Sequence, residues 1–277
     1  MFKQLILATA VVAAGVALAA AKTLDIYFID VEGGQSTLIV TPGRQSLLVD
    51  TGFAATSFAD TTTNRGRDAK RILAAARDAG VSRIDYLLTT HFHADHDGGV
   101  VEFVKQLPIA TFVDHGTPDE NVDSVPGSTE QFQAYARIRA KGKHLEPKPG
   151  DKIPLKGVDV TVVSAKRDVI AHLLPGATGA NSACGAALPA QEKNENPRST
   201  GIVLTYGSFR FADFGDLTGD PLHALVCPND LIGPVSVYLV AHHGGPDAAD
   251  PATFAAMRPR AAIVNNGRVK GGAPELF

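Results

Sequence analysis

Residues 91–96, with the sequence His-Phe-His-Ala-Asp-His, place three imidazoles and a carboxylate within six positions. Imidazole nitrogens and carboxylate oxygens are ligands that borderline divalent cations such as zinc prefer. In an extended segment, side chains two positions apart point the same way, so His91 and His93 can bind one cation together. Once the chain turns, Asp95 and His96 can face a second cation. The spacing predicts a metal centre, and a chance run of solvated histidines is the less favoured alternative.

The segments on either side place this motif at the end of a strand. Residues 84–90 are short, aliphatic and partly β-branched, which predicts a buried strand. Gly98 and Gly99 then predict a turn into a helix over 100–107. Because α/β proteins commonly bind ligands where strands end, we expect the motif to lie at a ligand site.

Further ligand-type residues follow two predicted strands in the second half of the chain. The strand at 209–214 is followed by Gly215 and Asp216, and the strand at 235–241 is followed by His242 and His243. Asp213 and Asp220 compete with Asp216 as the carboxylate of interest, and Asp216 can also act as a helix N-cap. The polar residues are therefore expected to meet where these strands end.

Several of these motifs resemble those of the metallo-β-lactamase-fold hydrolases. Residues 91–96 are similar to the His-x-His-x-Asp-His signature, Gly215-Asp216 to the Gly-Asp motif, and His243 to the last ligand motif. Residues 28–36 look most like secreted relatives of the nuclease-like domain of bacterial DNA-uptake channel proteins. The resemblance implies an α/β fold, the αββα four-layer sandwich of the metallo-β-lactamase type.

The resemblance also implies roles for individual residues. Asp50, in a Val-Asp-Thr-Gly segment, would brace the metal loop, although it can equally be a strand-end turn former. His115 follows a strand at 110–114, but it comes early for a third ligand of the first cation, so a substrate contact or no function remains open. Asp216 would bridge the two cations. The implied ligand set is His91, His93, Asp95, His96, His115, Asp216 and His243.

The implied activity is that of a hydrolase with two divalent ions, zinc by default and manganese or iron as alternatives. Such ions lower the pKa of a shared water, so that hydroxide becomes available as the nucleophile. Asp95 would orient this water or accept a proton, and His242 would bond substrate or shuttle a proton, unless His242 and His243 exchange roles. The implied substrate is a phosphodiester. The alternatives are a β-lactam or a lactone, or a non-catalytic metal-binding protein.

The whole chain has the composition of one globular domain. Its 277 residues are 44% apolar and carry a net charge of −3, so we expect a single domain over 22–277. The near-neutral charge gives no support to nucleic acid as a partner, although a small basic patch stays open. The resemblance leaves open a truncated C-terminus, and the sequence does not determine the oligomeric state.

The N-terminal residues predict export. Lys3, the apolar run at 5–20 and the small residues before Lys22 are typical of a signal peptide over 1–21. Removal of that peptide would leave a periplasmic or secreted protein without a stable membrane anchor. Export permits disulfides, so we expect Cys184 and Cys227 to pair and to hold the loop at 175–198. Two free buried thiols are the alternative.

Overall fold

The computed structural model describes residues 22–55, 65–118, 128–185, 193–248, 250–267 and 270–274. The predicted signal peptide lies outside the described residues, as does part of the loop expected at 175–198. Within the described ranges, no helix is long and apolar enough to cross a membrane.

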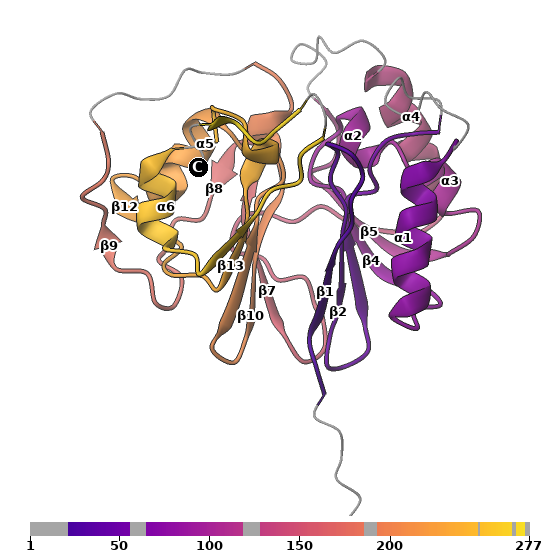
Figure 1. Ribbon diagram of the computed structural model, residues 1–277, viewed down its shortest axis with the longest axis horizontal. Coiled ribbons are helices and arrows are strands. Elements are labelled where there is room, and N and C mark those ends of the chain that lie inside the picture. Colours follow the sequence, from indigo (N-terminus) through magenta and orange to yellow (C-terminus); the bar gives the residue numbers. More distant parts are fainter. Residues whose placement is uncertain are drawn as a thin grey trace, which may run out of the picture.

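Two six-stranded sheets lie face to face (Figure 1). The first sheet has the order β1 (Asp25–Phe28), β2 (Thr37–Val40), β3 (Ser46–Val49), β4 (Ile84–Leu88), β5 (Ile109–Val113) and β6 (Lys143–Leu145). The second has the order β14 (Ala261–Ile263), β13 (Val237–Leu239), β11 (Phe209–Asp213), β10 (Gly201–Tyr206), β7 (Asp159–Ala165) and β8 (Asp168–Val169). A separate pair joins β9 (Gly179–Ala180) to β12 (Asn229–Asp230).

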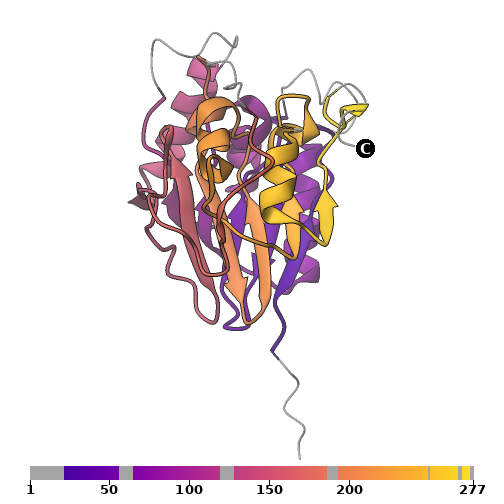
Figure 2. The same ribbon diagram turned by 90° about the vertical axis from the view of Figure 1, so that its left-hand side faces the viewer.

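Helices cover the outer face of each sheet, as Figures 1 and 2 show. The helices of the first half are α1 (Arg67–Asp78), α2 (Ala94–Asp97), α3 (Val100–Phe103) and α4 (Ser128–Arg139). Those of the second half are α5 (Gly219–Val226) and α6 (Pro251–Met257), with short 3-10 turns η2 (Asn196–Arg198) and η3 (Ala241–Gly244). The resulting order of layers is helix, sheet, sheet, helix, as predicted.

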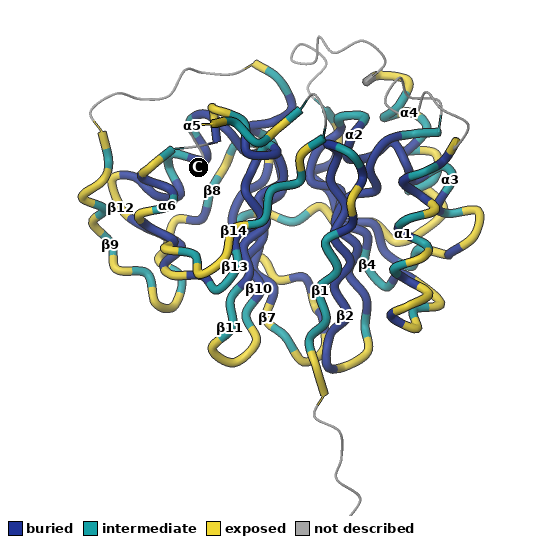
Figure 3. Tube along the Cα trace, viewed as in Figure 1, coloured by how far each residue is buried: buried dark blue, intermediate teal, exposed yellow. Residues whose placement is uncertain are grey.

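Three apolar clusters hold these layers together. One fills the space between the two sheets and consists of apolar side chains from strands of both sheets. The other two lie between each sheet and its own helices, and they include Ile72 of α1 and Leu225 of α5. Figure 3 shows the buried backbone concentrated in the paired sheets. Burial of apolar surface is the main favourable term in folding, so these clusters fix the relative positions of the strand ends.

The predicted disulfide is present in the second half of the fold. Cys184 and Cys227 are joined with an S–S distance of 2.06 Å across 43 positions of sequence. Cys227 lies directly after α5, and Cys184 follows the short strand β9. The bond therefore holds the segment around β9 against the end of α5, as expected.

The sheet topology brings the relevant strand ends to one rim. β3, β4 and β5 run parallel to one another, and β11 runs parallel to β13. The carboxyl ends of parallel strands meet at the same edge of a sheet, so the segments that follow β4, β11 and β13 can share a site.

Candidate metal centre

Four ligand-type side chains from both halves of the chain meet at this rim. The ligand atoms of Asp95, His96, Asp216 and His243 all lie within 4.8 Å of one another, and all four residues are buried. Asp95 and His96 belong to α2, Asp216 follows β11, and His243 lies in η3. The convergence of distant strand ends expected from the sequence is therefore present for these four residues.

The separations within this group match the coordination sphere of a small cation. Asp216 Oδ2 lies 3.2 Å from both His96 Nε2 and His243 Nε2, and these two nitrogens are 3.3 Å apart. Asp95 Oδ2 is 3.3 Å from His243 Nε2 and 3.7 Å from His96 Nε2. Ligands bonded to zinc at about 2.0–2.1 Å in tetrahedral geometry lie about 3.3 Å from one another. One cation therefore fits among these four side chains.

Contacts with residues outside these four show which nitrogen of each imidazole faces the centre. His96 Nδ1 lies 2.7 Å from Asp50 Oδ2, and His243 Nδ1 lies 2.9 Å from the Asn265 carbonyl oxygen. Both partners only accept, so each Nδ1 carries a proton, and in the neutral form of each ring Nε2 presents the lone pair. Those lone pairs face each other and the Asp216 carboxylate, an arrangement that a cation satisfies.

Asp50 holds His96 through a small network at the ends of β3 and β4. Its Oδ1 accepts a hydrogen bond from the Thr90 amide at 2.8 Å, and its Oδ2 accepts one from Thr90 Oγ1 at 2.8 Å. Gly215 makes room for the opposing loop, because a Cβ at that position would lie 2.6 Å from Thr90 Cβ. Asp50 therefore contacts the ring as expected of a residue that braces a ligand.

The protonation of the group follows from burial and from the charges inside it. Burial alone would lower the pKa of His96, but the carboxylates of Asp216 and Asp50 outweigh it and raise that pKa well above its ordinary value. Burial alone would raise the pKa of Asp216, yet His243 and His96 hold it well below its ordinary value. The pocket thus attracts positive charge strongly, which is what a cation site requires.

His91 and His93 lie beside the four-residue group. His91 Nε2 is 3.0 Å from His93 Nδ1 and 3.9 Å from Asp216 Oδ2. Burial, together with the neighbouring His96 and His93 rings, lowers the pKa of His91 well below its ordinary value, so the ring is neutral. His91 is therefore available as a neutral ligand on the other side of Asp216, with His93 beside it.

The structure does not bring His115 to this group. His115 is fully buried, and its Nε2 lies 3.0 Å from Glu195 Oε2. The other Glu195 oxygen lies 3.0 Å from Arg198 Nε, and the His115 ring packs on Phe92 with centroids 4.6 Å apart. This buried contact occupies the imidazole that the resemblance assigned to the first cation. Glu195 carried no sequence signal, because it stands in an irregular polar loop.

The three carboxylates that competed in the sequence, Asp213, Asp216 and Asp220, lie in different surroundings in the structure. Asp213 Oδ1 accepts hydrogen bonds from Gln35 Nε2 at 2.9 Å and from the Gly215 amide at 3.1 Å. Asp220 lies at the start of α5, partly exposed and 4.0 Å from Arg167. Asp216 alone among the three lies in the four-residue group.

Lys270 is a site residue that the sequence did not indicate. Its ammonium contacts Asp95 Oδ2, and the carboxylates of Asp95 and Asp216 raise its pKa against the opposing effect of burial. The segment that carries it is held against η3, because the Gly272 amide donates to the His243 carbonyl at 2.8 Å and the Ala273 amide to the Gly244 carbonyl at 2.8 Å. A positive charge thus stands at the edge of the centre.

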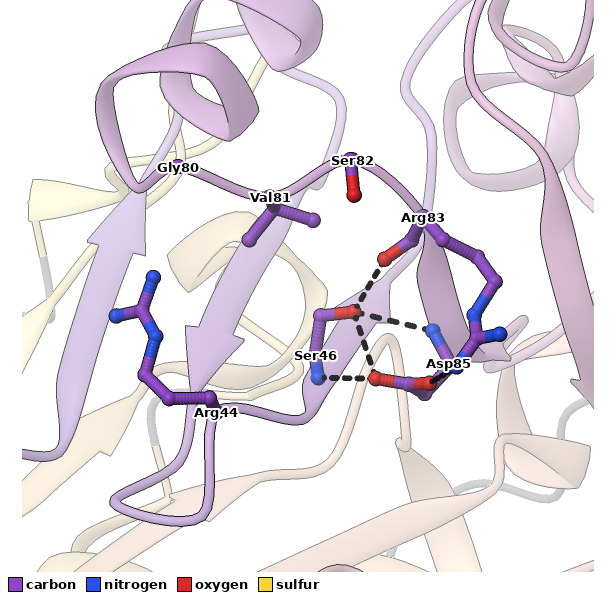
Figure 4. Close-up of a pocket in the computed structure, with 7 residues that line it drawn as sticks. All are labelled: Arg44, Ser46, Gly80, Val81, Ser82, Arg83 and Asp85. Carbon is purple, nitrogen blue, oxygen red and sulfur yellow. Dashed lines mark hydrogen bonds and ion pairs between the residues drawn. The ribbon is translucent and has the colours of Figure 1, made fainter.

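Two hollows flank the fold at different distances from the centre. One is lined by residues 28–34 and 263–266, and includes Asn265, whose carbonyl holds His243. The other lies at the amino ends of β3 and β4 and is lined by residues such as Arg44 and Arg83 (Figure 4). In the second hollow Ser46 and Asp85 bond each other, at the end of these strands opposite to the metal-binding motif.

A family model described as the Metallo-beta-lactamase superfamily matches residues 29–185, more than half of the chain. The chain belongs to the metallo-beta-lactamase superfamily. Most members of this superfamily are hydrolases, which agrees with the enzyme class expected from the motif at 91–96. Membership also suggests divalent metal ions, and the group around Asp216 is a candidate site for them.

Comparison with individual proteins gives more distant likenesses within and around this superfamily. Atrochrysone carboxyl ACP thioesterase of Aspergillus terreus is 32% identical over 75 residues, which is 27% of this chain and 20% of the relative. Lactamase-like protein aptB of Emericella nidulans is 37% identical over 75 residues, 27% of this chain and 21% of the relative. The chain thus spans about a fifth of these curated relatives. CmlA, a diiron β-hydroxylase from Streptomyces venezuelae, gives a TM-score of 0.47 at 14% identity, covering 87% of this chain and 44% of that one.

Proposed function

We propose that the protein is a metal-dependent hydrolase with two divalent ions, zinc by default, and that its substrate is a small phosphodiester. The observation that carries the metal-dependent part is the convergence of two Nε2 atoms on Asp216 Oδ2 at 3.2 Å. Asp95, His96, Asp216 and His243 would hold one cation, and His91 and His93 would contribute to the other. When bound, the cations would lower the pKa of water and stabilise developing negative charge on the substrate.

The chain's own residues supply orientation. Asp50 and the Asn265 carbonyl each hold an imidazole by its Nδ1–H, so the Nε2 atoms are aimed before any cation arrives. The buried carboxylates of Asp95 and Asp216 keep the centre negative. Such preorganisation reduces the rearrangement needed during the reaction, which is how a protein contributes electrostatically to catalysis.

Lys270 supports an anionic substrate. Its ammonium contacts the Asp95 oxygen that a cation would share, so binding of that cation disfavours the Lys270–Asp95 contact by charge repulsion. The ammonium then becomes available to an anion that reaches the centre. A phosphodiester carries one negative charge, which this single lysine can match. The likeness of residues 28–36 to DNA-uptake relatives points to the same bond type.

A nucleic acid gains less support than a small phosphodiester. Arg67 and Arg71 contact the segment 28–34 that lines the hollow beside the centre. Arg67 pairs with Asp68, and Arg71 pairs with Asp30 and Glu32. Nucleic-acid grooves present cations that are free to contact successive phosphates. The second candidate is hydrolysis of a thioester, lactone or β-lactam, which the names of the thioesterase and lactamase-like relatives favour.

The test compares the rates at which the zinc-loaded protein hydrolyses different chromogenic substrates. We expect bis(p-nitrophenyl) phosphate to be hydrolysed faster than a chromogenic β-lactam, a lactone or a thioester, and we expect activity to disappear with chelator and in Asp216→Asn. Lys270→Met is expected to raise KM for the phosphodiester, whereas Lys166→Met, whose lysine pairs with Glu146 on the surface, is expected to leave it unchanged. Activity that persists without metal contradicts the mechanism, and a faster thioester or lactam reaction contradicts the substrate.

We also propose that the protein is exported to the periplasm or secreted. The disulfide between Cys184 and Cys227 supports this location, because disulfides persist in oxidising compartments. The signal-like composition of residues 1–21 supports it as well. N-terminal sequencing of protein from the periplasmic fraction or the culture medium is expected to begin near Lys22. A cytosolic protein that retains Met1 would contradict the proposal.

A further inference from the structure

The described contacts do not join His115 to His91 and His93, the pair that the resemblance assigned to the same cation. Asp216 Oδ2 is shared between the two sides, at 3.9 Å from His91 Nε2. His115 is held in the buried pair with Glu195. His91, His93 and Asp216 make three ligands, and a tetrahedral zinc site has a fourth position, so a further donor near Asp216 is needed for a set of four protein ligands.

His242 lies where such a donor is needed. Its Nε2 is 3.9 Å from Asp216 Oδ2, the same separation as that of His91 Nε2. Its Nδ1 lies 2.8 Å from each oxygen of Asp247, so Nδ1 carries a proton and, in the neutral form of the ring, Nε2 presents the lone pair. This is the arrangement that His96 has with Asp50 and His243 with Asn265.

The backbone of η3 aims both histidines of this pair at Asp216. His242 and His243 have φ angles of 48° and 55°, in the left-handed region that residues with a Cβ seldom adopt. The His242 amide donates to the Gly215 carbonyl at 3.1 Å, which joins this turn to the loop that carries Asp216. Consecutive strained residues at a site indicate that their conformation serves the site.

We propose that His242 is the third imidazole of the first cation's ligand set, with His91, His93 and the shared Asp216, and that Asp247 positions it. Adjacent histidines in one turn thus supply one ligand to each of the two cations. The Asn196 amide nitrogen lies 3.2 Å from His242 Nε2 and would have to move aside for a cation. The inference rests on the proposed two-metal function, and it concerns binding, so it can be tested without turnover.

The alternative role for His242 is that of a proton shuttle that binds no metal. A shuttle and a ligand use the same Nε2 atom but differ in what removal of the ring does to metal content. A ligand is required for one cation to bind, whereas a shuttle can be removed with both cations retained. Metal stoichiometry therefore separates the two roles.

The experiment is a zinc titration of the full mature protein in competition with a chromogenic chelator, with the metal content of each variant measured by elemental analysis. We expect two zinc ions in the wild type and one in His242→Gln, with the affinity of the remaining ion unchanged within about threefold. Asp247→Asn is expected to lower the affinity for the first ion by about 10–100-fold, as loss of a partner that orients a ligand typically does. His172→Gln, at an exposed histidine, is the matched control and is expected to retain two ions.

The cobalt-substituted protein gives a second readout that does not depend on stability differences. Loss of one nitrogen ligand in His242→Gln is expected to change the visible absorption bands of one of two cobalt ions. Two tightly bound ions and unchanged bands in His242→Gln would overturn the assignment, as would a wild type that binds a single ion. If both ions bind as described and no substrate is hydrolysed, the proposed hydrolase function fails while the ligand assignment stands.

Discussion

Asp50 contacts the metal centre through a single oxygen, and its backbone is left-handed with φ at 59°. The same carboxylate accepts two hydrogen bonds from Thr90, so its orientation is fixed at both oxygens. Asn tolerates left-handed backbone about as well as Asp does. Asp50→Asn therefore changes the hydrogen bond to His96 with little strain, and it isolates the role of the carboxylate.

We predict that Asp50→Asn weakens binding of the cation held by His96 by about 10–100-fold. An amide NH2 at the Oδ2 position cannot accept the His96 Nδ1 proton, so the ring would favour the tautomer that protonates Nε2 and blocks the ligand atom. Competition with a chromogenic chelator measures the change. Asp85→Asn, at the opposite ends of β3 and β4, is the matched control and should retain wild-type affinity. Equal affinities for wild type and Asp50→Asn would count against the bracing role.

A second prediction concerns how the ionisation of Asp213 makes stability depend on pH. Burial, with a further contribution from Asp50, raises the pKa of Asp213 to about 7. An unfolded Asp has a pKa near 3.9, so the folded state binds this proton more tightly and stability falls as pH rises from about 4 through 7. Asp213→Asn keeps the acceptor for Gln35 and removes the titration. In metal-free protein, urea unfolding should show the variant gaining roughly 2 kcal/mol over the wild type between pH 5 and pH 8. A constant difference across that range would contradict the prediction.

The sequence indicated most of the ligand-type residues because their signal is local. Six adjacent positions contain the first motif, and Asp216 and His243 each follow a recognisable strand. His115 also follows a strand, but strand-end position does not say whether a side chain faces the centre or the neighbouring helix layer. Glu195 and Lys270 come from segments without periodicity, and only the folded chain brings them to the rim.

At the scale of elements, α4 is attached to the end of β5 by polar contacts to one buried carboxylate. Asp114 accepts hydrogen bonds from Tyr135 Oη at 2.6 Å and from Arg139 at 2.8 Å, and His144 Nε2 lies 2.9 Å away. These partners outweigh burial and lower the pKa of Asp114. The Arg139 side chain thus helps to dock the helix.

We predict that Tyr135→Phe lowers the free energy of unfolding by about 1–3 kcal/mol, because it removes a hydrogen bond to a buried charged group while keeping the ring packing. Chemical denaturation of the metal-free protein measures the loss. Tyr206→Phe removes a hydroxyl that bonds the Lys22 carbonyl near the surface, and as the matched control it should change stability by less than about 0.5 kcal/mol. Similar losses in both variants would mean that the Tyr135–Asp114 hydrogen bond contributes no more to the free energy of unfolding than a hydrogen bond near the surface.

The elements that the sequence predicted well are those with strong periodicity. The strand expected at 84–90 is β4, Ile84–Leu88, and the strand expected at 209–214 is β11, Phe209–Asp213. For α5 the sequence offered only the N-cap alternative at Asp216, whereas the structure has Thr218 as the N-cap and Gly219 and Pro221 in the first turn. Pro is tolerated in a first turn since those amides lack intrahelical partners, and burial of Leu222 and Leu225 then favours the helix. The helix expected at 100–107 is shorter in the structure, where α3 spans Val100–Phe103, although Leu107 packs in the same apolar cluster.

At the scale of the whole molecule, the centre lies between two halves that each have their own helix layer and share one inter-sheet core. Asp95 and His96 come from the first half, and Asp216 and His243 from the second. Contacts between imidazoles and carboxylates already cross the rim, because Asp216 lies 3.2 Å from His96 and Asp95 lies 3.3 Å from His243. A bound cation would add bonds that cross between the halves, so metal binding and the stability of the interface are coupled.

This coupling predicts a higher melting temperature for the loaded protein. A cation present at about 100 times its Kd stabilises the folded state by about 2.7 kcal/mol, and for a domain of this size each kcal/mol raises Tm by about 2–4 °C. We therefore expect zinc to raise Tm by roughly 5–10 °C over protein in chelator, measured by calorimetry. Asp216→Asn should abolish the shift, because it removes the carboxylate that both sides share, whereas Asp85→Asn should lower both melting temperatures and keep their difference. An equal Tm with and without zinc would mean that the four side chains do not bind one cation across the two halves.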